Sequence, residues 1–197
     1  GITAAATMGA GYGLALVAVL AQWGPWPTHT AYILHMLLTV ITAIWILHTP
    51  ETRQPSHGTV KMTILDLTVR EMLQMLHVPT AAHKRFVRVV MPVAPWVFGC
   101  AGAAYALLPQ LLSDSAGNAP IAFSGLMTVI TLGCGVGVQM LGRIVDTHKS
   151  ARASAIAMAV ITVGAIFAAF AAHTLSLPLG ITAAATMGAG YGLALVA

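Results

Sequence analysis

The chain has 197 residues, of which 58% are hydrophobic and only 7% are charged, whereas soluble domains carry about 25% charged residues. As a soluble body it would expose large apolar patches to water, and a lipid bilayer removes that problem. The net charge of +4 does not indicate a nucleic-acid partner, because the basic residues lie in two short loops. The composition therefore predicts an all-α, polytopic transmembrane helix bundle whose first partner is the lipid bilayer.

Six stretches are long and apolar enough to cross a bilayer, which takes about 20 mostly apolar residues. In chain order they are Ile2–Trp23, Ala31–His48, Phe86–Leu112, Ala119–Leu141, Ala153–Ala172 and Pro178–Ala197. Nine of the charged residues lie between Thr49 and Arg88, and the others are Asp114, Arg143, Asp146, Lys149 and Arg152. A soluble helix bundle would not confine its charges in this way, because each of its helices needs a polar face.

The first 18 residues, GITAAATMGAGYGLALVA, recur without change at residues 180–197. An internal structural repeat diverges and spans a whole structural unit, whereas this repeat is perfect and occupies only the two ends. With six spans, the two copies would also cross the membrane in opposite directions. We therefore expect one copy, residues 1–18, to be an artefact of a cloning scar or of a circular or mis-joined gene fragment. A clean genomic read across residues 17–20 would contradict this expectation.

The connections between the spans alternate in basic charge. Residues 23–30, 113–118 and 173–177 contain no Lys or Arg, whereas residues 49–85 and 142–152 contain several. Cytoplasmic loops of membrane proteins carry the excess of Lys and Arg. We therefore predict that 49–85, 142–152 and both termini are cytoplasmic, in a multi-pass protein of the plasma (inner) membrane.

Residues 49–85 are predicted to contain an amphipathic helix. Asp66, Arg70 and Gln74 lie opposite apolar or weakly polar residues with helical spacing, which are Ile64, Leu65, Thr68, Val69, Met72, Leu73 and Leu76. Such a helix is expected along the membrane surface or under the bundle. Binding of a soluble partner is the alternative role.

The segment at 142–152, GRIVDTHKSAR, resembles the conserved cytoplasmic loop of the major facilitator superfamily (MFS), G-x-L-A-D-R-x-G-R-R. Gly142 and Asp146 match the first glycine and the acidic position, and Lys149 and Arg152 supply basic charge slightly out of register. Thr147 replaces the arginine that follows the acidic residue in the family. The resemblance implies a conformational latch whose contacts differ between two states. The alternative is a basic cytoplasmic loop in which the aspartate caps a helix.

A second resemblance to the same superfamily lies at the junction of a span and the long loop, where Pro50, Glu51, Thr52 and Arg53 read PETR. Members of the superfamily often end their sixth span with a PET-type sequence. On this resemblance, residues 19–48 end an N-terminal helix bundle, 49–85 form the central cytoplasmic loop, and 86–197 form part of a C-terminal bundle. The chain would then be an internal fragment, from span five or six to span ten, of an MFS-like transporter with twelve spans.

Four polar or amphipathic side chains inside the spans are candidates for lining a transport pathway: His35, Trp96, Tyr105 and Gln139. His35 and Gln139 are costly in lipid, so we expect both to face the bundle interior. A hydrogen bond between helices is the alternative role for each of them.

The Phe86–Leu112 span is expected to be loosened by two prolines and two glycines, Pro92, Pro95, Gly99 and Gly102. Transporters use interrupted helices near their substrates, and a kink tolerated by neighbouring helices is the alternative. Cys100 and Cys134 lie in apolar stretches without CxxC spacing, so we expect neither a metal site nor a cofactor.

The sequence thus predicts a secondary active transporter of small solutes, not an enzyme, that works by alternating access. A proton is one option for its coupling ion, although the only ionisable candidate inside the spans is His35. The alternatives are a membrane-embedded enzyme or assembly subunit of unknown activity, and a fragment with no function of its own. No catalytic constellation is visible inside the spans.

Overall fold

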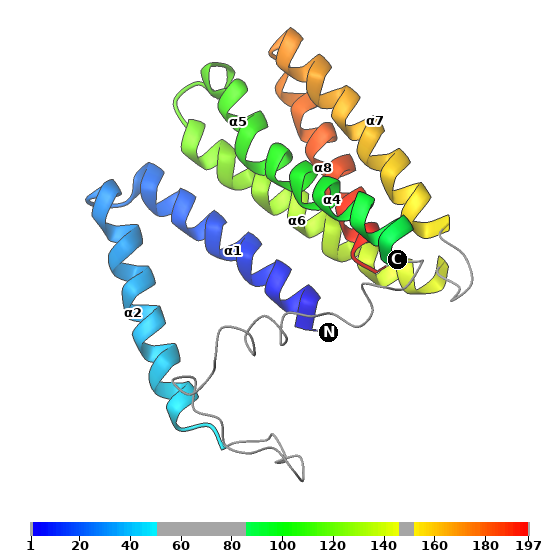
Figure 1. The fold of residues 1–197 in the computed structure, drawn as a ribbon. Helices are drawn as coiled ribbons and strands as arrows, with labels where there is room; N and C mark the ends of the chain where they lie inside the picture. The colour runs from blue at the N-terminus through cyan, green and yellow to red at the C-terminus, as the bar shows by residue number, and fades with distance from the viewer. Residues whose placement is uncertain (1, 51–85, 146–151, 197) are drawn as a thin grey trace, which may run out of the picture.

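The computed structural model of the protein describes residues 2–50, 86–145 and 152–196. The amphipathic helix expected within 49–85 lies outside these residues. The described elements are all helical, which confirms the all-α prediction (Figure 1). They are α1 (Ile2–Trp23), α2 (Pro27–Leu47), η3 (Phe86–Val90), α4 (Met91–Gly102), η4 (Ala103–Leu107), α5 (Leu108–Leu111), η5 (Ser113–Ala116), α6 (Pro120–Val145), α7 (Arg152–Thr174) and α8 (Leu177–Ala194).

Five helices in the described residues are long and apolar enough to cross a membrane: Ala4–Trp23, Pro27–Leu47, Phe86–Leu111, Pro120–Gln139 and Arg152–Thr174. They are compatible with a multi-pass membrane protein. The sixth predicted span forms α8, which is not among the five. The reason lies in its composition, since α8 is built largely of Gly, Ala and Thr and is the most enclosed helix of the bundle. A helix enclosed by protein does not need the hydropathy of one that faces lipid.

The third predicted span is interrupted, but not at the four residues expected to loosen it, since Pro92, Pro95, Gly99 and Gly102 all lie within the α-helix α4. Two π-helical turns, η3 and η4, lie on either side of α4. At the second turn the Leu108 N–H donates to the Ala103 carbonyl five residues back. Pro109 follows and has no N–H, so the Tyr105 carbonyl loses its usual helical donor. The helix is therefore wider at Tyr105, as π turns are.

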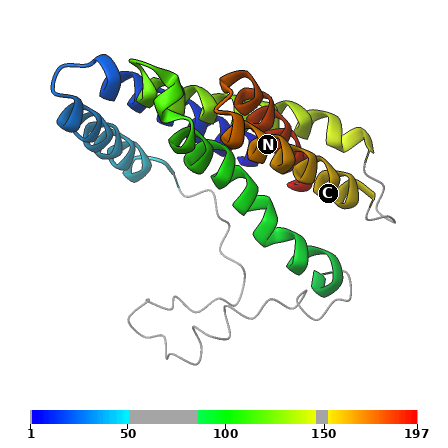
Figure 2. The same ribbon diagram turned by 90° about the horizontal axis from the view of Figure 1, so that it is seen from above.

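Helix α8 is the centre of the bundle and packs on α6, α7 and α4. It runs parallel to α6, with Gly188 at Thr131 and Gly192 at Gly135. It runs antiparallel to α7, where Gly190 meets Ile161. A Cβ on Gly188 or Gly192 would collide with a backbone carbonyl of α6, so only glycine permits this approach. Figure 2 shows the Phe86 end of the third helix extending away from the others, where Val87, Val90 and Met91 are exposed.

Helix α1 lies along the other side of α6 and runs antiparallel to it, with Ala18 at Gly125 and Gly11 at Leu132. Helix α2 folds back beside α1 and is almost entirely exposed (Figure 1). The turns at 24–26, 112–119 and 175–176 therefore lie at one end of the molecule, and the opposite ends of α1, α6, α7 and α8 lie at the other (Figure 1). The three connections without Lys or Arg share an end.

Candidate functional site

The interface between α1 and α6 has a polar end. The Gln22 amide, in the last turn of α1, donates from Nε2 to the Asn118 carbonyl at 3.1 Å. Its Oε1 accepts the backbone N–H groups of Ile121 at 3.1 Å and Ala122 at 3.3 Å. The first N–H groups of a helix have no partner within that helix. Gln22 therefore caps α6 from a different helix and ties the two helices together at this end.

The middle of the same interface is apolar and narrow. Gly11 meets Leu132, and a Cβ built on Gly11 would lie 3.5 Å from the Leu132 Cβ. Leu132 is near the centre of α6, whose 26 residues span about 39 Å at about 1.5 Å per residue. Because the hydrocarbon core of a bilayer is about 30 Å thick, this contact would lie close to the midplane of a bilayer that α6 crosses.

A cavity of about 430 Å³ lies on one flank of this contact, and we call it the central cavity. Its first wall belongs to α1 and consists of Ala6, Thr7, Ala10 and Leu14. The facing wall comes from α4, η4, α6 and the C-terminal part of the chain and consists of Phe98, Ala101, Tyr105, Leu132, Tyr191 and Leu195. The cavity is thus an open cleft between α1 on one side and the α4–α8 bundle on the other, and Phe98 on its wall is 65% exposed.

Aromatic rings shape the facing wall. Phe98 and Tyr191 meet edge to face, with ring centroids 6.4 Å apart and planes at 65°, an arrangement that aromatic pairs favour. Tyr105 is carried by the π-helical turn η4. Neither tyrosine hydroxyl makes a hydrogen bond to another residue in the described part of the chain.

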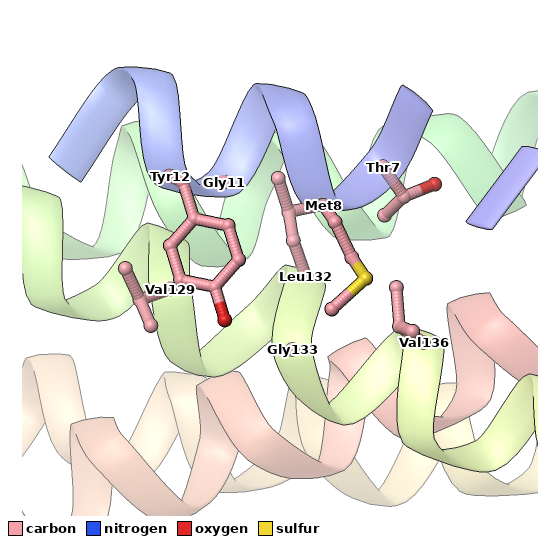
Figure 3. A pocket seen from close by; sticks show the side chains of 8 residues that line it. All are labelled: Thr7, Met8, Gly11, Tyr12, Val129, Leu132, Gly133 and Val136. Carbon is pink, nitrogen blue, oxygen red and sulfur yellow. The ribbon is translucent and has the colours of Figure 1, made fainter. Parts of the chain in front are cut away.

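A smaller cavity of about 170 Å³ lies on the other flank of the Gly11–Leu132 contact (Figure 3). Met8 and Tyr12 extend from α1 over α6, where Val129, Gly133 and Val136 form the floor. At the depth of Gly11 and Leu132 the contact is therefore flanked by open space, whereas Ala18 packs closely against Gly125 nearer the Gln22 end.

Of the four predicted pathway residues, only Tyr105 lines the central cavity. Gln139 is buried, as expected, and 6% exposed. Its Nε2 has no hydrogen-bond partner among the described residues, so the helix–helix hydrogen bond considered for it is not made there. Trp96 is 68% exposed and points away from the core. The four residues therefore do not converge on one site.

The His35 side chain is exposed, although it faces the neighbouring helices. It lies on the wall of a third cavity of about 470 Å³, between α1, α2 and the start of α6. The physical reason is the position of α2, which contacts α1 and leaves most of its own surface uncovered.

The predicted latch and loop junction lie mostly outside the described residues. Gly142 is part of α6, and Arg152 is the exposed first residue of α7. Asp146 and Lys149 are not among the described residues, and neither are Glu51, Thr52 and Arg53; Pro50 follows the end of α2. Both motifs remain predictions.

Sequence reasoning missed Gln22, Phe98 and Tyr191. A lone amide at the end of an apolar span was the available signal for Gln22. Phe98 gave no signal, since every predicted span contains at least one aromatic residue. Tyr191 lies in the repeated segment, where its copy Tyr12 occupies a different environment.

The described residues contain no group of three His, Cys, Asp or Glu side chains that could hold a metal ion. Cys100 is buried, and its thiol donates to the Val97 carbonyl at 3.2 Å and to the Met187 carbonyl at 3.9 Å. These contacts fit a packing role between α4 and α8.

No protein-family model, curated protein or solved structure matches the chain. The function is therefore inferred from the α1–α6 interface and the central cavity beside it.

Proposed function

We propose that the chain is part of an MFS-type secondary active transporter that moves small solutes by alternating access. The proposal takes residues 1–18 as native sequence, in place of the artefact expected from the terminal repeat, because they form one wall of the cavity. Helices α1 and α2 would belong to one bundle and α4 to α8 to the other. The observation that carries the proposal is the central cavity, which lies between these two groups at the depth of Leu132, half-way along α6. Carriers of this kind bind their solute near the bilayer midplane, where two structural repeats meet.

The form of the α1–α6 interface supports a moving contact. Gly11 and Leu132 touch along a narrow line, with a cavity on each flank. By contrast, α8 is held by backbone-to-backbone approach to α6 at Gly188 and Gly192. A small tilt of α1 would therefore open the interface without disturbing the α8 core.

Each end of the α1–α6 interface has a contact that would close it. Gln22 joins α1 to the start of α6 at the predicted outer end. The 142–152 loop, with the latch expected from its sequence, follows the other end of α6. In alternating access these two closures would be made in opposite phases of the cycle.

The π-helical turn at Tyr105 also favours a solute site. Interrupted helices occur beside transporter substrates, and π turns are frequent at functional sites. Here the interruption carries a side chain of the cavity wall.

The test is a reversible cross-link across the interface in the complete protein. A Gly11→Cys/Leu132→Cys pair would place its Cβ atoms 3.5 Å apart, within the range of about 3.5–4.5 Å that disulfides require. Cys100 and Cys134 are first replaced by Ser. Uptake of a panel of radiolabelled neutral and charged solutes is then measured in cells, against cells with an empty vector.

Oxidation is expected to abolish uptake by the double variant, and dithiothreitol is expected to restore it. The two single variants serve as controls and are expected to ignore the oxidant. Full uptake by the cross-linked protein would show that the interface does not move during transport, and the proposal would be withdrawn.

A further inference from the structure

We infer that the central cavity takes an uncharged, largely apolar solute that contains an aromatic ring and a hydrogen-bond acceptor. This inference deepens the proposed function, and it depends on that function for the claim that the bound solute is also the transported one. It is based on three features of the cavity wall: the lack of charged side chains, the aromatic rings, and the tyrosine hydroxyls without hydrogen-bond partners among the described residues.

The lining of the cavity contains no Asp, Glu, Lys, Arg or His side chain. The charged side chains that the structure describes, Arg88, Asp114 and Arg152, lie near the ends of the helices or in the turn at η5. An ionised solute would give up its hydration at mid-membrane depth and meet no opposite charge in this lining, which is very unfavourable. The lining therefore selects against ions of either sign.

Three aromatic side chains give the wall its preference for a ring. Phe98 and Tyr191 already form an edge-to-face pair, and Tyr105 borders the same space. A planar ring entering the cavity can extend this pair with offset or edge-to-face contacts. The opposite wall has alanines at positions 6 and 10, which leave room for the ring.

The two tyrosine hydroxyls add specificity. Tyr105 is half-buried and Tyr191 is buried, and neither hydroxyl makes a hydrogen bond within the described residues. Each hydroxyl can donate to a carbonyl, ether or amine group on the solute. The volume of about 430 Å³ falls within the range of about 300–1,000 Å³ that is usual for small-molecule sites.

The experiment measures binding by the full 197-residue chain in lipid nanodiscs. The probe is N-phenyl-1-naphthylamine, a neutral aromatic amine whose fluorescence rises in apolar surroundings. Its anionic relative 8-anilino-1-naphthalenesulfonate has the same rings and a sulfonate group. We expect saturable binding of the neutral probe above the signal of empty nanodiscs, and binding at least tenfold weaker for the sulfonate.

Substitutions in the cavity wall test whether the neutral probe binds there. Ala101→Phe fills the cavity and is expected to abolish the saturable signal, and Tyr191→Phe, which removes only a hydroxyl, is expected to weaken it severalfold. Ile166→Phe, on the exposed face of α7, is the matched control and is expected to change nothing. If Ala101→Phe does not fold, as judged by gel filtration and circular dichroism, Ala10→Phe fills the cavity from its open α1 side.

Equal binding of both probes, a neutral signal no greater than that of empty nanodiscs, or unchanged binding in the cavity-filling variants would each overturn the inference. Failure of the inference and failure of the proposed function are separable. Transport of charged solutes that is blocked by the disulfide between positions 11 and 132 would reject only the solute class. Saturable neutral binding without any transport by the complete protein would reject only the carrier function.

Discussion

Two glycines of α8 and their copies in α1 occupy opposite environments. Gly188 and Gly192 approach the backbone of α6 so closely that a Cβ would collide with it. Their copies in the repeated segment, Gly9 and Gly13, have nothing within 4 Å of a built Cβ. Because the two segments are identical in sequence, their intrinsic helix propensity is the same. Any difference between equivalent substitutions therefore measures tertiary packing alone.

We predict that Gly192→Ala destabilises the protein and that Gly13→Ala does not. Overpacking of a close contact costs about 1–3 kcal/mol, which exceeds the gain of up to about 1 kcal/mol that alanine brings in a helix. At Gly13 there is no close contact to overpack, so only the gain in helix propensity remains. Thermal unfolding in detergent, followed by circular dichroism, should show a lower Tm for the first variant and an equal or higher Tm for the second.

The pair Gly188→Ala and Gly9→Ala repeats the comparison one turn away. Equal changes of Tm within both pairs would contradict the packing of α8 on α6. A confirmed difference would show that identical glycines are closely packed in α8 and free of contacts in α1. The two copies run antiparallel on opposite sides of α6, as a six-span topology would require.

At the scale of elements, hydropathy predicted the helices but not their contacts. The bounds Ile2–Trp23 were predicted to the residue, and α2 begins four residues earlier than expected because Pro27 can occupy the first turn of a helix. The partners of each face could not be predicted, since a span that is apolar all round gives no sign of its buried side. Phe98 and Tyr191 were missed for this reason.

The polar cap between α1 and α6 gives the second prediction. Gln22→Leu removes a side chain that makes two hydrogen bonds to the first turn of α6 and one to the Asn118 carbonyl just before it. A net loss of about 1–2 kcal/mol would raise the open population of that turn by roughly 5- to 30-fold. Hydrogen–deuterium exchange of the Ile121 and Ala122 amides should accelerate by this factor.

The matched control is Gln110→Leu, at an exposed position of α5. This substitution changes the same chemical group and should leave exchange at the start of α6 unaltered. Protection of Ile121 and Ala122 that survives the loss of Gln22 would mean that α1 does not close this end of the interface.

At the scale of the whole molecule, the direction of the helices places three turns at one end. Residues 24–26, 112–119 and 175–176 lie together, and the end of α2 lies at the other end (Figure 1). The first three connections contain no Lys or Arg, and the chain beyond α2 is basic. Geometry and charge thus agree on which connections share a membrane face.

We therefore predict the labelling pattern of single cysteines placed in a background with Cys100→Ser and Cys134→Ser. Thr28→Cys and Asn118→Cys should react with a membrane-impermeant maleimide in intact cells, because both exposed residues lie at the predicted outer end. Thr49→Cys should react only after permeabilisation, because the 21 residues of α2 extend about 32 Å at about 1.5 Å per residue, enough to cross the hydrocarbon core. The cysteine-free parent should not be labelled in either condition. Labelling of all three positions in intact cells would mean that α2 does not cross the membrane. The α1–α6 interface could then not open alternately to two sides, and transport by this chain would lose its physical basis.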